Sequence, residues 1–207
     1  MMVNTSSERT SSSAAAARIR RAAIEAFAET GYAGTSTRAI TGHLGLSATA
    51  MYPHYRSKEE LLFAIASEGH RLVLEAMRAA DAQARTEPSV TWTDRLRAVV
   101  AAFAQWQARE SRLARVVQYE MRSLSREHFH EIAAVRAETT SLVTDLVEGG
   151  IVAGEFGINE GGDAVLAIMS LCVDVCRWFP ARGYRDPDAV GAVYANLAAS
   201  LVESRLR

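Results

Sequence analysis

Apolar residues recur every three or four positions along most of the chain, which is the period of an amphipathic helix. The segment 14–30, for example, places Ile19, Ala23, Ala26 and Phe27 on one face. No stretch shows the sustained alternation of apolar and polar residues that is typical of a half-buried strand. The pattern therefore predicts an all-α protein with about nine helices.

Start and stop signals divide these helices. Ser36, Ser47 and Ser57 stand where an N-terminal cap is favoured, and Gly31 and Gly45 follow predicted helix ends, where a left-handed residue is common. The predicted helices cover residues 14–30, 37–44, 48–54, 58–85, 91–109, 111–122, 126 to the glycines near 150, 160–179 and 188–206.

The composition is that of a globular protein, with 49% hydrophobic and 23% charged residues among 207. The polar stretch 1–13 has no hydrophobic region of a signal peptide and is expected to be a disordered arm; the alternative is a basic arm that touches DNA. No apolar run approaches the roughly 18 residues of a membrane span, so no membrane partner is expected. Cys172 and Cys176 cannot build a disulfide framework, which favours a reducing, cytoplasmic environment.

Charge is distributed unevenly between the two ends of the chain. Residues 1–60 contain seven basic and five acidic side chains, a net charge of +2, whereas the whole chain has a net charge of −1. The asymmetry is small. If nucleic acid is the partner, the positive potential must be confined to one face.

The segment 35–61 has the pattern of a helix-turn-helix. Two short helices flank a turn at Gly45, and neither is long enough to be stable alone. They must be braced by the helix at 14–30, and the residues expected to meet in that core are Ile19, Phe27, Ile40, Leu44, Leu46, Met51 and Tyr55. In this motif the second helix enters the major groove. A domain at 14–60 is therefore predicted to bind double-stranded DNA, and residues 61–207 form a second domain.

Candidate DNA contacts are the residues that open these short helices and those on the outer face of the second. Helix N-termini bind phosphate through free N–H groups and the helix dipole, and Thr49 can hydrogen-bond a base or touch a thymine methyl. The predicted contacts are Ser36, Thr37, Arg38, Ser47, Ala48, Thr49, Tyr52, His54, Tyr55 and Lys58. The alternative is a helical hairpin that only packs against its neighbours.

Residues 14–65 resemble the TetR family of regulators. The resemblance rests on FAETGY at 27–32, TSTRAI at 35–40, GLS at 45–47, MYPHY at 51–55 and SKEEL at 57–61. It implies a homodimer that places one recognition helix per subunit in successive major grooves of a palindromic operator. It also implies a C-terminal domain in which a small-molecule effector lowers DNA affinity, as in a repressor; an activator on the same fold remains open.

The sequence departs from the family pattern at three sites. Ala48 stands where the family usually has lysine, so a phosphate-binding cation is missing. Pro53 removes a backbone donor and is expected to end the recognition helix near Tyr52. Thr41-Gly42 replaces the usual alanine and acidic residue. These changes affect which operator is read.

The C-terminal domain carries a weaker resemblance. The last two helices are apolar on one side and, as in the family, are expected to form the dimer interface. The run 167–180 is similar to TetR-type regulators of fatty-acid and steroid catabolism, which implies an acyl-CoA or other lipid-like effector. Pocket candidates, chosen as large apolar side chains with a few polar neighbours, are Phe103, Trp106, Gln107, Val117, Met121, Phe129, Val135, Met169 and Cys172. Ordinary core packing is the alternative for each.

Other chemistry is not indicated. His128 and His130 point to different sides of a helix, and no histidine is in register with the two cysteines, so no metal site is expected. Asp174 lies in an apolar run and needs a partner if buried, either Arg177 or an arginine of a second subunit. No nucleophile elbow, P-loop or dinucleotide fingerprint occurs, so neither an enzyme nor a cofactor is expected. The alternative function is a helical acyl- or lipid-binding module, or an enzyme, that has lost DNA recognition.

Overall fold

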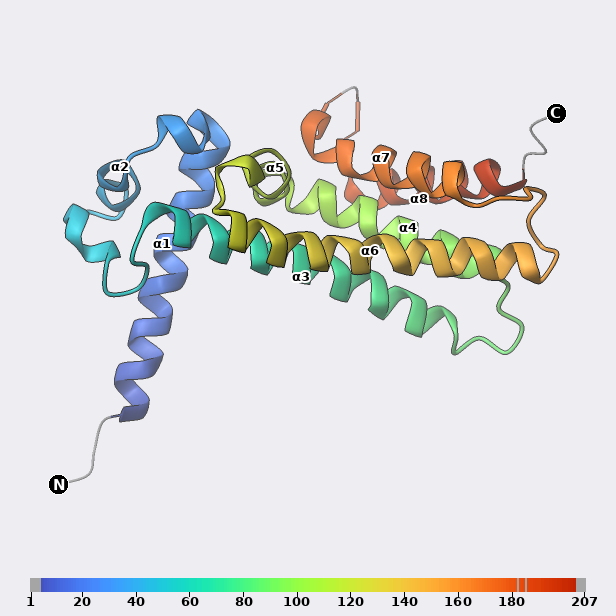
Figure 1. Ribbon diagram of the computed structural model, residues 1–207, viewed down its shortest axis with the longest axis horizontal. Helices are drawn as coiled ribbons and strands as arrows, with labels where there is room; N and C mark the ends of the chain where they lie inside the picture. Colours follow the sequence, from blue (N-terminus) through green and yellow to red (C-terminus); the bar gives the residue numbers. More distant parts are fainter. Residues whose placement is uncertain (1–4, 182, 185, 204–207) are drawn as a thin grey trace.

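The computed structural model describes residues 5–181, 183–184 and 186–203, which form helices joined by turns (Figure 1). This part of the chain contains eight α-helices and two short 3-10 helices, as expected for an all-α protein. In chain order they are α1 (Thr5–Gly34), α2 (Thr37–Gly42), η1 (Ala48–Met51), α3 (Lys58–Ala84), α4 (Trp92–Arg109), α5 (Ser111–Tyr119), η2 (Met121–Ser123), α6 (Arg126–Val152), α7 (Gly162–Trp178) and α8 (Pro187–Glu203).

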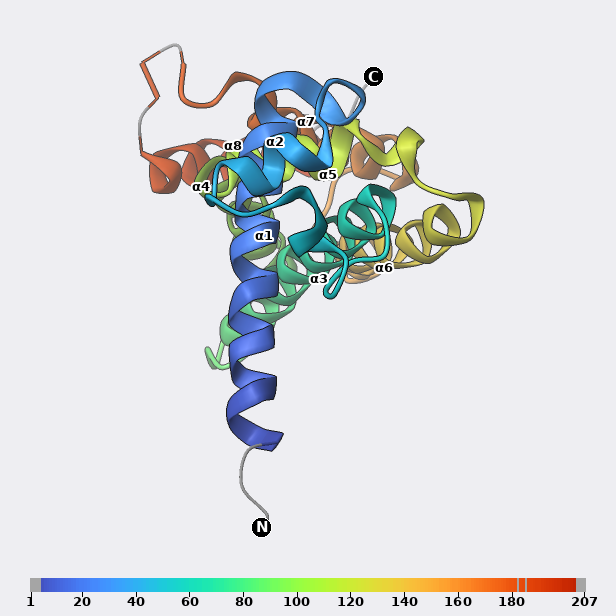
Figure 2. The same cartoon turned by 90° about the vertical axis from the view of Figure 1, so that its left-hand side faces the viewer.

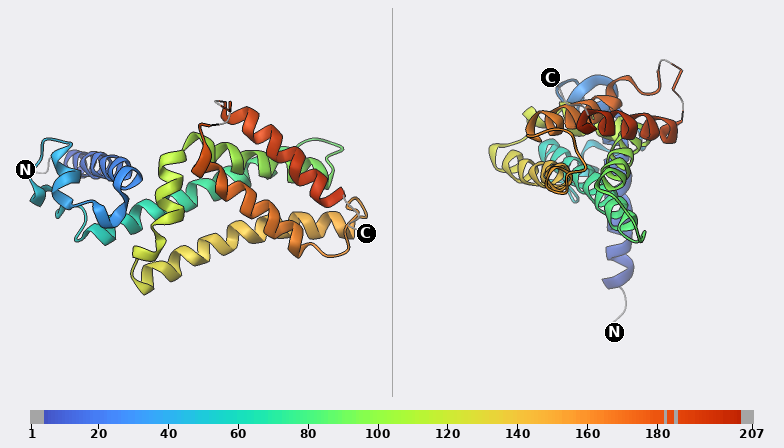
Figure 3. Two further views of the ribbon diagram at one scale, coloured as in Figure 1. Left: turned by 90° about the horizontal axis from the view of Figure 1, so that it is seen from above. Right: turned by 90° about the vertical axis from the view of Figure 1, so that its right-hand side faces the viewer.

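The helices form a small unit and a larger bundle. α1, α2 and η1 lie at one end of the molecule, while α4, α6, α7 and α8 form the bundle at the other, with the first turns of α1 projecting away from the body (Figures 1 and 2). α4 is central to the bundle and contacts α3, α6, α7 and α8. α5 lies across the end of the bundle that faces the small unit (Figure 3). None of the described helices combines the length and apolar character needed to cross a membrane.

Each unit has its own core, and α3 contributes to both. Leu61 and Ile65, near the start of α3, pack with α1 and α2, whereas Val73 and Met77 pack with the bundle. The boundary predicted at residue 60 therefore falls in the first turn of a helix that continues through both cores. A continuous helix of 27 residues gives the two units a stiff mechanical link.

Polar caps explain where several helices begin. The hydroxyl oxygen of Ser36 accepts a hydrogen bond from the N–H of Ala39 at 3.1 Å, and Ser57 does the same for Glu60 at 3.0 Å, which confirms both predicted caps. α4 begins with a reciprocal capping box between Thr91 and Asp94.

The start of the first helix differs from the prediction. α1 begins at Thr5, so residues 5–13 are helical rather than a disordered arm, and residues 1–4 lie outside the described part. The alanine run 14–17 favours helix strongly and lets it extend backwards through the polar residues before it. At the other end, Gly31 has the expected positive φ, of 74°, but helical turns resume and continue to Gly34.

Two more corrections concern short or glycine-containing segments. The third of the nine predicted helices is the 3-10 helix η1, and the segment predicted at 111–122 is divided into α5 and η2. Gly149 and Gly150 lie within α6 instead of loosening it. A Cβ at Gly149 would come within 2.2 Å of the Trp92 ring, and one at Gly150 within 2.1 Å of the Phe156 ring. These glycines therefore allow close packing against the helix.

Candidate nucleic-acid interface

The recognition segment around η1 presents its polar side chains to solvent. Ser47, Thr49 and Tyr52 are exposed, with Tyr52 retaining 51% of its surface, and Ala48 is half-buried. The segment is one 3-10 turn followed by tight turns, and the N–H of Tyr55 bonds the carbonyl of Met51 at 2.9 Å. The 3-10 helix ends at Met51, next to Tyr52, which agrees with the end near Tyr52 that was predicted from Pro53. Thr49 and Tyr52 are thus free to contact a groove.

The inward side of the same segment fixes its position. Ile40 and Met51 are completely buried against Ile19 and Phe27 of α1, as predicted. Leu46 was expected in this core but is 41% exposed, because the turn at Gly45, with a φ of 68°, carries it outward.

Tyr55 belongs to the core and not to the contact surface. Its ring is buried. Its hydroxyl accepts a hydrogen bond from Arg20 at 2.9 Å and donates one to the carbonyl of Ala16 at 3.4 Å. These contacts hold α1 to the end of the recognition segment. This confirms the predicted place of Tyr55 in the core, whereas a DNA contact by the same side chain is not favoured by its burial. Sequence reasoning missed Arg20, since nothing in its local pattern indicates a partner 35 residues away.

Lys58 also has a structural role in this structure. Its ammonium donates hydrogen bonds to the carbonyls of Tyr32, at 2.8 Å, and Thr35, at 2.7 Å, and it lies 4.0 Å from the centre of the Tyr32 ring. Tyr32 lies in the last turn of α1 and Thr35 follows the helix, in a region where backbone carbonyls lack a full set of helical partners. The ammonium is therefore directed at protein acceptors, and not outward as a phosphate contact would require.

The start of α2 provides the second part of the surface. Ser36 caps it, Thr37 is half-buried and Arg38 is exposed, and no acidic residue stands in the first turn. Ser47 differs from Ser36. Its hydroxyl makes no cap hydrogen bond and pairs instead with the hydroxyl of Thr49 at 2.9 Å. His54 is half-buried at the far end of the recognition segment.

The predicted pocket residues do not all lie in one place. Phe103 and Cys172 are buried in the bundle core, with Trp106 and Met169 packed against it. Met121 packs in a separate cluster with Ala66 and Ile132, and Val117 and Gln107 are buried while Val135 is half-buried. Phe129 is 41% exposed and belongs to none of the described core clusters, so the structure does not support this candidate. Its position in the first turn of α6, away from the bundle, explains the exposure.

Two buried polar side chains and one half-buried one lie on helices of this bundle. His70 and Gln107 are buried, and burial together with the charge of Arg136 lowers the pKa of His70 to about 3. Burial also lowers the pKa of Arg136. Of the three, only Gln107 was predicted from the sequence. A histidine on the buried stripe of a helix was the signal for His70.

The remaining reactive groups are ordinary. Burial raises the pKa of Cys172, and it is the largest influence raising the pKa of Cys176 to about 11, so both are inert thiols. No group of three potential metal ligands occurs among the described residues. Asp174 is not buried; it accepts hydrogen bonds from Arg177, one of the two partners that were predicted.

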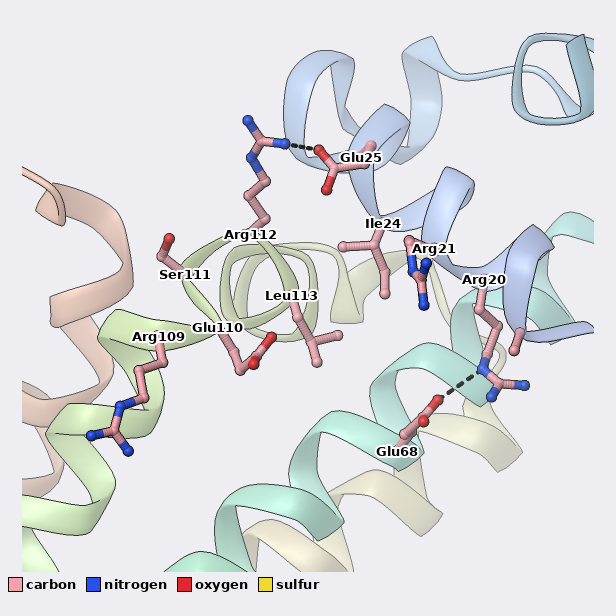
Figure 4. Close-up of a pocket in the computed structure, with 11 residues that line it drawn as sticks. Arg20, Arg21, Ile24, Glu25, Glu68, Arg109, Glu110, Ser111, Arg112 and Leu113 are labelled. Carbon is pink, nitrogen blue, oxygen red and sulfur yellow. Dashed lines mark hydrogen bonds and ion pairs between the residues drawn. The ribbon is translucent and has the colours of Figure 1, made fainter. Parts of the chain in front are cut away.

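A charged cleft of about 490 Å³ separates α1 from α3 and α5 (Figure 4). Arg20 reaches Glu68 across it at 2.8 Å, and Arg112 pairs with Glu25. A lining of ion pairs differs from the mostly apolar lining of small-molecule pockets. We therefore regard this cleft as the junction between the two units.

A second junction lies at the start of α6. Glu59 on α3 accepts hydrogen bonds from the N–H of Ser125 and from the ring of His128, both at 2.8 Å, and the His128 ring stacks on Phe63. Burial alone would raise the pKa of Glu59, but these hydrogen bonds outweigh it and the pKa is lowered.

Comparisons with known proteins agree with this architecture. Residues 19–65 match the family described as bacterial regulatory proteins, tetR family, and residues 89–202 match the tetracyclin repressor-like C-terminal domain. A tetR-family regulatory protein from Rhodococcus RHA1 is 49% identical, with 91% of this chain and 96% of that chain covered and a TM-score of 0.84. PfmR, a TetR-family transcriptional regulator from Thermus thermophilus, is 26% identical, with 92% of this chain and all of that chain covered and a TM-score of 0.76.

One curated relative carries a metabolic name. The fatty acid metabolism regulator protein of Bacillus subtilis (strain 168) is 26% identical over 146 residues, which cover 70% of this chain and 72% of that protein. Both family models and the exposed helix-turn-helix point to the same conclusion. The chain belongs to the TetR family of bacterial regulatory proteins and is a transcriptional regulator with an N-terminal DNA-binding domain.

Proposed function

We propose that the protein is a homodimeric repressor that binds a palindromic operator and is released by a small acyl-type effector. The observation that carries the DNA-binding part is the contrast along one short segment, in which Ile40 and Met51 are buried while Thr49 and Tyr52 face solvent. The buried residues hold the exposed ones in a fixed position, and this is what groove readout requires. A DNA-binding regulator of this kind acts in the bacterial cytoplasm.

The dimer part is supported by an exposed apolar face on α7 and α8. Leu166 retains 67% of its surface, and Leu171, Val193 and Leu197 are also exposed. Apolar side chains grouped on two helices are typical of a protein–protein interface. The occupant we propose is a second copy of this chain, because a palindrome requires two recognition segments related by a two-fold axis.

The effector class is supported by a relative and by the composition of the bundle core. The Bacillus subtilis relative is named as a regulator of fatty acid metabolism. In this chain, the core that contains Phe103 and Cys172 is built from apolar side chains of five helices, α3, α4, α6, α7 and α8, which suits an acyl chain.

The direct test is selection of bound fragments from genomic DNA, followed by measurement of affinity for the enriched palindrome. Tyr52→Ala is expected to weaken operator binding by about 1–3 kcal/mol without lowering the melting temperature, because Tyr52 is exposed. Tyr52→Phe separates the hydroxyl from the ring. His130→Ala, an exposed change on α6, serves as the control that leaves affinity unchanged.

The alternative is an acyl-binding module that has lost DNA recognition, motivated by Ala48 in place of a phosphate-binding cation. The same selection separates the two functions. If no sequence is enriched while acyl compounds still bind, the alternative is favoured and the repressor is not.

A further inference from the structure

Two polar side chains are enclosed in the bundle and have buried atoms that lack a hydrogen-bond partner among the described residues. His70 on α3 is 3% exposed and Gln107 on α4 is fully buried; the His70 Nε2 atom and both amide atoms of Gln107 lack hydrogen-bond partners among the described residues. Buried polar groups are nearly always paired because an unpaired one destabilises the fold. An amide that is unpaired at both ends therefore points to a role other than stability.

The fold places these two side chains at the same end of the core. Val73 and Phe103 belong to the same core; His70 lies about one turn before Val73, and Gln107 lies about one turn after Phe103. α3 begins, and α4 ends, on the side of the small unit (Figure 3). Both side chains are thus displaced from the apolar core toward the DNA-binding domain.

Arg136 joins them from α6. It lies two turns before Val143 of the same core, again on the side of the small unit, and its charge acts on His70. Its guanidinium donates to the side-chain carbonyl of Gln118 at 2.8 Å and to the sulfur of Met121 at 3.4 Å. Neither partner is charged, and none of the ion pairs among the described residues involves Arg136.

A half-buried guanidinium with only neutral partners is suited to bind an anion, since Arg forms short, charge-assisted hydrogen bonds with carboxylate and phosphate oxygens. His70 remains neutral at physiological pH, so it can hydrogen-bond a ligand without adding a second positive charge. The arrangement is therefore amphipathic: polar groups at the end near the DNA-binding domain, and an apolar core beyond them.

We propose that Arg136, Gln107 and His70 bind the anionic head of an amphipathic acyl effector, whose hydrocarbon chain extends into the core around Phe103. This inference rests on the proposed function and names the residues and ligand chemistry of its effector site. The anionic oxygen belongs either to the carboxylate of a free fatty acid or to the phosphates in the coenzyme A part of an acyl-CoA. Comparison of palmitate with palmitoyl-CoA separates these two sources.

The position of the site also suggests how binding reaches the DNA. Residues 126–138 of α6 bury only Ile132, whereas the second half of the helix is well packed. A segment with few buried contacts is displaced at low cost. Its start bonds Glu59 in the first turn of α3, so a ligand that moves Arg136 would move the helix that carries the DNA-binding unit.

The test measures binding of palmitate, palmitoyl-CoA and hexadecanol to the purified full chain by calorimetry, and operator release by fluorescence anisotropy. Palmitate or palmitoyl-CoA is expected to bind the protein and to release it from the operator. The uncharged alcohol is expected to do neither. Arg136→Met is expected to weaken the anionic ligand by roughly tenfold or more. Arg136→Lys should recover part of that loss, and Arg126→Met, an exposed change on the same helix, should leave affinity unchanged.

The melting temperature of a Gln107 variant separates a binding role from a structural one, because the two roles predict changes of opposite sign. Gln107→Leu removes a buried, unpaired amide. It is therefore expected to raise the melting temperature of the unliganded protein and to lower the affinity for the ligand. A fall in melting temperature with unchanged affinity would mean that Gln107 only supports the fold.

The outcomes distinguish this inference from the proposed function. Effector-driven operator release that is unchanged in Arg136→Met overturns the site but leaves the repressor standing. Arg136-dependent binding in a protein that selects no operator supports the site and overturns the repressor. Equal affinity for palmitate and hexadecanol, or binding of none of the three compounds, overturns the site.

Discussion

Replacing Lys58 by methionine tests whether this side chain holds the fold or holds DNA. The substitution keeps the apolar stem and removes the ammonium. The ammonium makes hydrogen bonds of 2.8 and 2.7 Å to the carbonyls of Tyr32 and Thr35 and stacks over the Tyr32 ring. All of these contacts join α3 to the last turn of α1 and the loop that follows it, so the loss is expected to appear as reduced stability.

The magnitude follows from those contacts. A hydrogen bond from a charged donor contributes about 1.5–3 kcal/mol, but Lys58 is half-exposed and water can replace part of each bond, so we take about 1 kcal/mol for each. A cation over an aromatic ring adds about 0.5–1 kcal/mol at such a site. The total is about 3 kcal/mol. For a chain of this length each kcal/mol shifts the melting temperature by about 2–4 °C, which gives a decrease of roughly 6–12 °C.

The assays are thermal unfolding and the salt dependence of operator binding. A phosphate contact contributes about 0.9 to the slope of log affinity against log salt, hence about 1.8 for the two subunits of a dimer. Lys58→Met is expected to leave this slope unchanged. Arg38→Met, at the exposed start of α2, is the matched comparison and should lower the slope without lowering the melting temperature. An unchanged melting temperature with a reduced slope in Lys58→Met would refute the structural role.

Three further predictions follow from other contacts. In a denaturant titration, Gly45→Ala should lower the free energy of unfolding by about 1 kcal/mol because a φ of 68° is costly for alanine. Gly42→Ala, at a glycine with open space around it, should be neutral or slightly stabilising in the same titration. Burial would raise the pKa of Asp81, but hydrogen bonds from Arg95 and Arg85 outweigh it and the pKa is lowered; the pair therefore stabilises the fold above the unfolded pKa of about 3.9 and loses that effect as pH falls through the folded value. The difference in melting temperature between wild type and Asp81→Asn should thus be large at pH 7 and vanish in acid, and a difference that persists in acid would contradict it. Leu197→Arg on α8 should dissociate the dimer in analytical ultracentrifugation with helicity retained, and an intact dimer would exclude this part of the α7–α8 face from the interface.

Periodicity and caps were sufficient to predict the helical class and most helix positions. Ser36 and Ser57 cap their helices as expected, and the apolar face of α1 is buried at Ile19 and Phe27. These features are local. A capping hydroxyl acts within one turn of its helix, and an amphipathic stripe needs only some apolar partner, so neither depends on which distant segment supplies the contact. The same local order, with Thr49 and Tyr52 opposite Met51, was enough to indicate an outward recognition surface.

The roles of individual side chains depended on residues far away in the chain. Tyr55 and Lys58 stand in the right segment for DNA contacts, yet Arg20 and the carbonyls at the end of α1 occupy them, at separations of 23 to 39 residues. Likewise, the juxtaposition of His70 and Arg136 exists only because α3 and α6 pack side by side. A sequence specifies which groups each residue carries, whereas hydrogen bonds and burial are pairwise and short-ranged, so only the tertiary arrangement decides which of those groups meet.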